Sequence, residues 1–202
     1  MGIARLRRGS LVLLGGAALL GCGLFAGPDI ALPIANLDLE PKPGHVEVPM
    51  IEPQGPPVVI ASGEVSGEAF TLTVYPTEGG LCMSLAAPTH RGGGCGPGPG
   101  DGLPEFERFG MISQADVESG ISEVDGLVDP DVATVWVVTG DGQRANAVLI
   151  PLDIDGMGAA VFLVFLPEGA HAVAVVAADA SGQVLEEFPL LSAPGAAPAP
   201  SG

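Results

Sequence analysis

The sequence predicts an all-β protein, an antiparallel β-sandwich of the immunoglobulin-like or a similar type. Short segments rich in Val, Ile, Phe and Thr either alternate apolar with polar residues or form brief apolar runs. Glycine and Asp-Gly turns separate these segments at the spacing typical of antiparallel sheets. No run of twelve or more residues has a clean helical period. We therefore expect strands throughout residues 58–191.

The first predicted strands form a meander. They cover residues 58–65, 69–75 and 81–86, with turns at Ser66-Gly67 and at 78–80. In the second of these strands, three apolar side chains alternate with those of Thr71, Thr73 and Tyr75. Because successive side chains of a strand point to opposite faces, we expect this hydroxyl-bearing face to lie in water.

Seven further segments complete the predicted sheets. They cover residues 109–114, 120–124, 132–139, 145–152, 160–166, 171–178 and 183–188. Asp141-Gly142 predicts a hairpin turn between the third and fourth of these segments. We expect Trp136, in the middle of an apolar strand, to fill the core rather than to stack on a ligand.

Composition divides the chain into four parts, namely residues 1–21, 22–57, 58–191 and 192–202. Residues 23–57 contain eight prolines and no sustained helical or strand period, which predicts a tether. In a polyproline II conformation, at about 3.1 Å per residue, such a tether spans roughly 100 Å. The final part is rich in Ala, Pro and Gly, so we expect it to be a disordered tail.

The N-terminal 21 residues have the pattern of an export signal. Arg5, Arg7 and Arg8 occur without any acidic residue, and ten apolar or glycine residues follow at 11–20. This apolar stretch is shorter than the about 20 residues that a membrane-spanning helix needs, and glycines interrupt it. We therefore expect the segment to be removed on export.

Leu19-Leu20-Gly21-Cys22 resembles the lipobox of bacterial lipoprotein precursors, in which an aliphatic residue, a variable residue and Gly or Ala precede a cysteine. The resemblance implies cleavage before Cys22 and a diacylglycerol on its thiol. Two or three acyl chains, at about 0.8 kcal/mol per buried methylene, would hold the protein at the cell membrane or outer membrane, outside the cytoplasm. An ordinary secretory signal with a chance cysteine is the alternative. Residues 68–85 and 92–96 also resemble segments of uncharacterised exported proteins of high-GC bacteria, which implies no activity.

The chain is strongly acidic. Without residues 1–21 it keeps four of its seven basic residues and all 24 acidic ones, a formal charge of −20. Such a charge repels nucleic acid, so we expect no nucleic-acid partner. The acidic residues are spread along the sequence, as expected for a solvated surface.

Cys82 and Cys95 are the remaining cysteines, and we predict a disulfide between them because exported proteins meet oxidising conditions. Closing the loop between them stabilises the domain by about 3 kcal/mol. We expect the bridge to hold the glycine-rich stretch 92–100 as a loop over the outer face of the sheet. A metal site lacks further close ligands, since only His90 lies nearby.

The sequence contains few motifs for other chemistry. The glycine-rich stretch lacks the Gly-Lys-Ser/Thr of a phosphate loop. Residues 129–131 and 153–156 start like calcium loops but lack the later ligands, so turns explain these Asp pairs. His90 and His171 are isolated in the sequence, and we assign no catalytic residue, metal ligand or cofactor.

These observations predict a membrane-anchored envelope lipoprotein with a non-catalytic β-sandwich that binds or spaces another component. Its expected partners are the membrane, through the lipid on Cys22, and an unknown envelope protein or ligand. Two alternatives stay open. One is a calcium-dependent adhesion module, and the other is a hydrolase whose site is assembled from distant loops.

Overall fold

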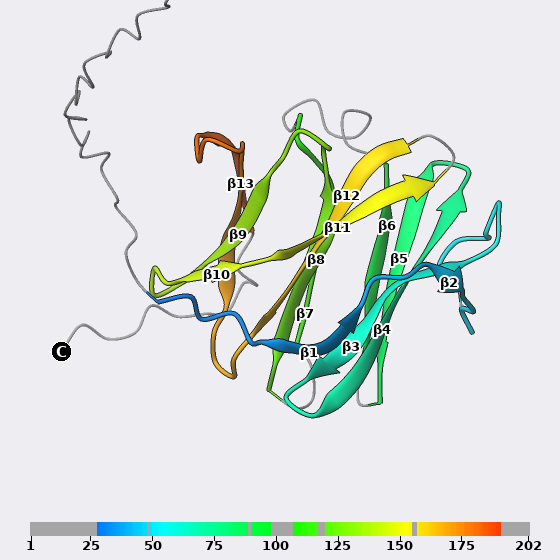
Figure 1. Cartoon of the computed structure of the whole chain (residues 1–202), viewed down its shortest axis with the longest axis horizontal. Coiled ribbons are helices and arrows are strands. Elements are labelled where there is room, and N and C mark those ends of the chain that lie inside the picture. Colours follow the sequence, from blue (N-terminus) through cyan, green and yellow to red (C-terminus); the bar gives the residue numbers. More distant parts are fainter. Residues whose placement is uncertain are drawn as a thin grey trace, which may run out of the picture.

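The computed structural model describes residues 28–47, 49–88, 90–97, 107–116, 120–154 and 157–190. All regular structure in this part of the chain is β-strand, as the sequence predicted, and the strands pair antiparallel (Figure 1). The described residues contain no apolar helix long enough to cross a membrane. Residues 1–27 and 191–202, including the predicted signal, Cys22 and the tail, lie outside the described part.

The strands form three sheets. The first sheet has the order β1-β3-β4-β5-β6, with β2 beside β3. Its strands are β1 (Ile34–Asp38), β2 (Lys42–Pro43), β3 (Val58–Val65), β4 (Glu68–Thr77), β5 (Gly80–Ala87) and β6 (His90–Gly96). The middle sheet has the order β11-β12-β8-β7. Its strands are β7 (Phe109–Asp116), β8 (Ser122–Val128), β11 (Val148–Ile154) and β12 (Met157–Leu166). The third sheet has the order β10-β9-β13-β14 and contains β9 (Thr134–Thr139), β10 (Arg144–Asn146), β13 (Ala172–Ala178) and β14 (Val184–Pro189).

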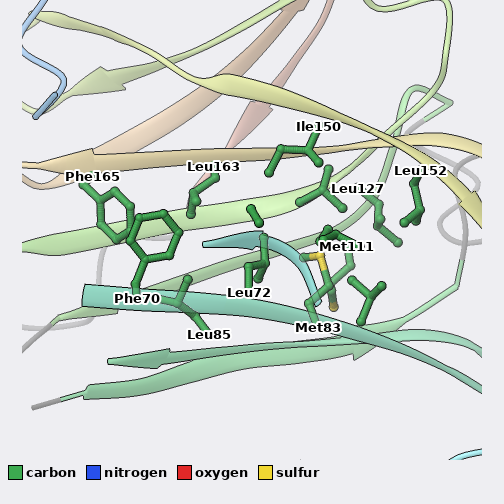
Figure 2. Close-up of a cluster of buried hydrophobic side chains, with 14 of the residues drawn as sticks. Phe70, Leu72, Met83, Leu85, Met111, Leu127, Ile150, Leu152, Leu163 and Phe165 are labelled. Carbon is green, nitrogen blue, oxygen red and sulfur yellow. The ribbon is translucent and has the colours of Figure 1, made fainter. Parts of the chain in front are cut away.

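The middle sheet is covered on both faces. Leu127 of β8 and Leu163 of β12 belong to the apolar cluster shared with the first sheet (Figure 2). Val124 and Val164, on the opposite faces of the same strands, belong to the cluster shared with the third sheet. The sandwich therefore has three layers, and burial on both sides explains why β12 is apolar at nearly every position.

One predicted strand is divided between two sheets. The segment 145–152 contains the end of β10, which pairs with β9, and most of β11, which pairs with β12. Between them, the amide of Ala147 donates a hydrogen bond to the carbonyl of Val135 at 2.9 Å. The chain thus passes from the third to the middle sheet at one residue. The predicted turn at Asp141-Gly142 joins β9 to β10, and Gly142 has the left-handed φ of 80° that favours glycine there.

The prediction of a tether over residues 22–57 is wrong for the residues that the structure describes. Strands β1 and β2 both pair with β3, so the domain includes this proline-rich segment. Its apolar residues Leu32, Ile34 and Leu37 pack against the first core cluster. Asp29 binds the third sheet, where Asn146 donates to it from its backbone amide at 3.0 Å and from its side chain at 2.7 Å. Proline is compatible with short strands at a sheet edge, so its density did not exclude strands here.

The predicted water-exposed face of β4 is also corrected. Thr73 and Tyr75 are only 5 % and 0 % exposed, because residues 44–47 and 49–57, here called the strap, pass over them. The backbone amide of Met50 donates a hydrogen bond to the Tyr75 hydroxyl at 3.2 Å. Gly44 lies so close to Thr73 that an added Cβ would come within 2.9 Å of its methyl group. The residue alternation along β4 is as predicted, but no feature of the sequence indicates that the strap covers this face.

The glycine-rich stretch is a strand at its start and not a loop. Residues 90–96 form β6, which pairs along its whole length with β5. Added Cβ atoms at Gly94 and Gly96 would lie 2.8 Å from the sulfur and 3.1 Å from the Cβ of Met111. The missing side chains therefore let Met111 of β7 pack directly on the β6 backbone, one of the recognised uses of glycine within strands. Residues 98–100 lie outside the described part.

Candidate binding site

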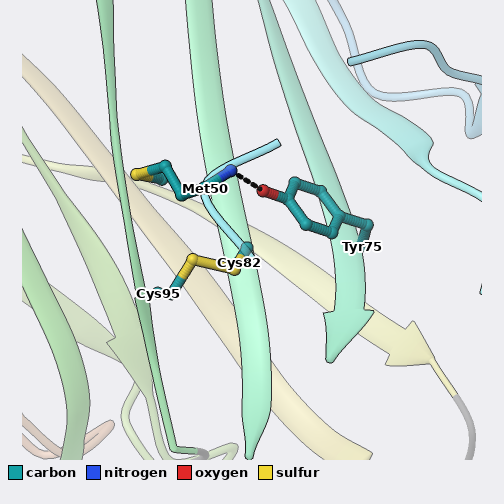
Figure 3. Close-up of a disulfide and its surroundings, with 4 residues drawn as sticks. All are labelled: Met50, Tyr75, Cys82 and Cys95. Carbon is teal, nitrogen blue, oxygen red and sulfur yellow. Dashed lines mark hydrogen bonds between the residues drawn. A yellow bond between two sulfur atoms is a disulfide. The ribbon is translucent and has the colours of Figure 1, made fainter. Parts of the chain in front are cut away.

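The predicted Cys82–Cys95 disulfide is present. The two cysteines are direct partners on β5 and β6, with their Cα atoms 4.0 Å apart. Cys82 is fully buried, and Figure 3 shows the bridge beside Tyr75 and Met50 of the strap. The bridge joins two hydrogen-bonded strands, so it fixes the sheet under the strap rather than a loop over the sheet.

The Asp pairs and histidines are not brought together into a site within the described residues. The amide of Asp131 donates to Asp129 at 2.8 Å, and the Arg108 guanidinium lies 3.4 Å from the Asp129 carboxylate, as expected for a turn. No group of three potential metal-binding side chains occurs among the residues that the structure describes. His171 is exposed before β13, and His90 begins β6, where its side chain lies outside the description. Residues 155 and 156 of the second Asp motif also lie outside it.

Trp136 is not a core residue. It lies on the outer face of the third sheet and is partly exposed, while its neighbours Val135 and Val137 fill the core. The Arg144 guanidinium carbon lies 4.0 Å from the centre of the indole ring, and Asn146 accepts a hydrogen bond from Arg144 Nε at 2.8 Å. This cation–π contact stabilises the ring on the surface. The prediction of a core filler failed because both faces of β9 carry apolar residues.

Two acidic residues lie inside the first core. Glu123 and Asp125 project from the same face of β8 as Leu127 and are 2 % and 0 % exposed. Burial raises the pKa of Glu123 above its ordinary value, and a hydrogen bond with Asp125 opposes part of this rise. This pair was not predicted from the sequence, because the acidic residues were expected to lie on the surface. The signal was the spacing of two acids in an otherwise apolar strand.

A cavity of about 530 Å³ lies between the strap and the first sheet, next to β7. Its floor includes Thr73 of β4 and Ser84 of β5, which are direct cross-strand partners, and Gly93 of β6, which pairs with Ser84. Gly93 must be glycine, since it has a φ of 140° and an added Cβ would lie 2.2 Å from the Met83 carbonyl oxygen. The remaining lining residues come from the strap, from β4 to β6 and from β7: His45, Val46, Glu47, Met50, Tyr75, Ala86, Arg91, Gly92, Ser113, Gln114 and Ala115.

Among its described residues, the cavity carries the ion pair between Arg91 and Glu47. Arg91 of β6 lies 2.7 Å from the carboxylate of Glu47 in the strap, and their side chains are 66 % and 63 % exposed. A pair this exposed contributes little to stability because water and salt screen it. The other groups on the walls are mainly hydroxyls, an amide and small apolar side chains. The volume is in the range of small-molecule sites, which are about 300–1,000 Å³.

Comparisons of the chain with protein-family models, with curated proteins and with solved structures found no match. The cavity beneath the strap was not predicted from the sequence, because the strap was expected to be part of a tether and the floor strand β6 part of a loop.

Proposed function

We propose that the chain is a bacterial envelope lipoprotein, anchored at the cell membrane or outer membrane by a lipid on Cys22, whose β-sandwich binds a small ligand. The cavity beneath the strap is the observation that supports binding. Hydroxyl, amide and charged side chains line it, and the Arg91–Glu47 ion pair at its rim is open to solvent. The lipobox-like residues 19–22 support the anchor.

Cys22 lies only a short distance along the chain from the first described residue of the domain. Five residues separate Cys22 from Pro28, and six fully extended residue-to-residue steps reach at most about 20 Å. The lipid would therefore hold the domain close to the bilayer and not at the end of a long stalk. The chain enters the domain beside β10, across the molecule from β2, where the strap begins (Figure 1). We infer that the cavity faces away from the membrane, open to ligands in the surrounding compartment.

Metabolic labelling tests the anchor. Cells that express the full chain are grown with labelled palmitate, alongside cells that express Cys22→Ser and the matched neighbour variant Gly23→Ala. We expect label in the original chain and in Gly23→Ala and none in Cys22→Ser, because only the thiol forms the thioether. Equal labelling of all three chains, or label in none of them, contradicts the proposed anchor.

A further inference from the structure

We propose that the cavity beneath the strap binds a zwitterionic ligand, a free amino acid or a short peptide, with its carboxylate on Arg91 and its ammonium group on Glu47. This inference rests on the proposed function, since it names the class of ligand for the same site. The observation that supports it is that the charges of Glu47 and Arg91 come from different elements, the strap and β6.

The Arg91–Glu47 pair costs little to open. Both side chains are about two-thirds exposed, so their mutual attraction is screened and worth about 0–1 kcal/mol. Separating them leaves one cation and one anion at the rim of a single cavity. A zwitterion restores a partner for each charge, and a guanidinium binds a carboxylate through two parallel hydrogen bonds.

The walls between these charges suit an amide backbone. Thr73 and Ser84 sit side by side on the floor, and Ser113 and Gln114 face the cavity from β7. Hydroxyl and amide groups both donate and accept hydrogen bonds, which matches the alternating N–H and C=O groups of a peptide. Ala86 and Ala115 leave space for small side chains, and about 530 Å³ accommodates a tripeptide.

Other ligand classes fit less well. Sugars usually stack on an exposed Trp, Tyr or Phe ring, but among the described lining residues Tyr75 is the only one of these types, and it is fully buried with its hydroxyl bound by Met50. A purely anionic ligand would approach a chain of strong negative charge and meet Glu47 beside Arg91. A purely cationic ligand would meet Arg91.

Calorimetric titration of the purified chain in detergent micelles tests the inference. The probes are tri-alanine, N-acetyl-tri-alanine, tri-alanine amide and maltotriose. We expect tri-alanine to bind and each blocked form to bind roughly tenfold more weakly, because one charge-assisted hydrogen-bonded contact is lost. Arg91→Gln should weaken tri-alanine to the same extent and remove the effect of amidation. Glu47→Gln should also weaken the binding of tri-alanine to this extent, and it should remove the effect of acetylation.

The control variant is Arg144→Gln, which removes a cation on the third sheet and should leave all affinities unchanged. Equal binding of blocked and free peptides overturns the inference, as does the absence of measurable heat with every peptide. Binding of maltotriose in place of the peptides also overturns it, while leaving a ligand-binding function intact. Palmitate labelling of Cys22 reports on the anchor independently of all these results.

Discussion

The buried pair Glu123 and Asp125 predicts that the domain loses stability as the pH rises above the ordinary glutamic acid pKa. Burial raises the pKa of Glu123, with the hydrogen bond to Asp125 acting against it. The cross-strand neighbours of the pair are Ser113 and Ala115 on β7 and Leu163 and Phe165 on β12. Burial of the Glu123 carboxyl therefore favours its protonated form.

The sign and size of the effect follow from proton linkage. Below a pH of about 4.5, the ordinary pKa of the carboxyl, Glu123 is protonated in both states and its stabilising effect is complete. Above this pH the unfolded chain releases the proton while the folded chain keeps it. The free energy of unfolding then falls by up to about 1.4 kcal/mol for each pH unit until the raised folded pKa is reached.

Urea unfolding between pH 4.5 and 8.5 measures this dependence. Glu123→Gln keeps the shape and the hydrogen-bonding ability of the side chain but cannot ionise, so its stability should fall less with pH than that of the original chain. The difference between the two chains should grow in favour of the variant as the pH rises. Glu187→Gln on β14, where the side chain is exposed, is the control and should run parallel to the original chain. A constant difference between Glu123→Gln and the original chain across this pH range would refute the reasoning.

Two further predictions concern the first sheet. Replacing both Cys82 and Cys95 by Ala should lower the free energy of unfolding by about 3 kcal/mol, because the bridge no longer restricts the unfolded chain. Urea unfolding under non-reducing conditions measures this loss, and a loss below about 1 kcal/mol would contradict the prediction. Gly94→Ala should cost about 1–3 kcal/mol, since the new Cβ would lie 2.8 Å from the Met111 sulfur. Gly79→Ala, where an added Cβ meets nothing within 4 Å, is its control, and equal stability of the two variants would show that β6 does not pack on Met111 as described.

The sequence correctly predicted those strands and turns whose formation depends mainly on residues close together in the chain. Strand β3 coincides with the predicted segment 58–65, and the turn at Asp141-Gly142 was recognised from turn chemistry alone. The all-β class and the disulfide followed in the same way, from alternation and from the pairing of two exported cysteines. These features depend on residues close together in the sequence or on a very small number of possible partners.

The errors concern features that only tertiary packing decides. Gly94 and Gly96 belong to a strand because Met111 packs against them, and nothing in the glycine-rich sequence identifies that neighbour. Residues 34–38 resemble a linker between prolines until β3 is available to pair with them. Both errors prevented prediction of the candidate cavity, because the strap covers it and β6 forms part of its floor. Its charges, Glu47 and Arg91, are 44 positions apart and could not be connected from the sequence.

The lipid anchor on Cys22 is the central claim, and mass spectrometry of the N-terminal peptide of the protein isolated from its native membrane tests it most directly. The account predicts a chain that begins at Cys22 and carries a diacylglycerol on the sulfur. A free thiol at Cys22, or a chain that still contains residues 1–21, would contradict it.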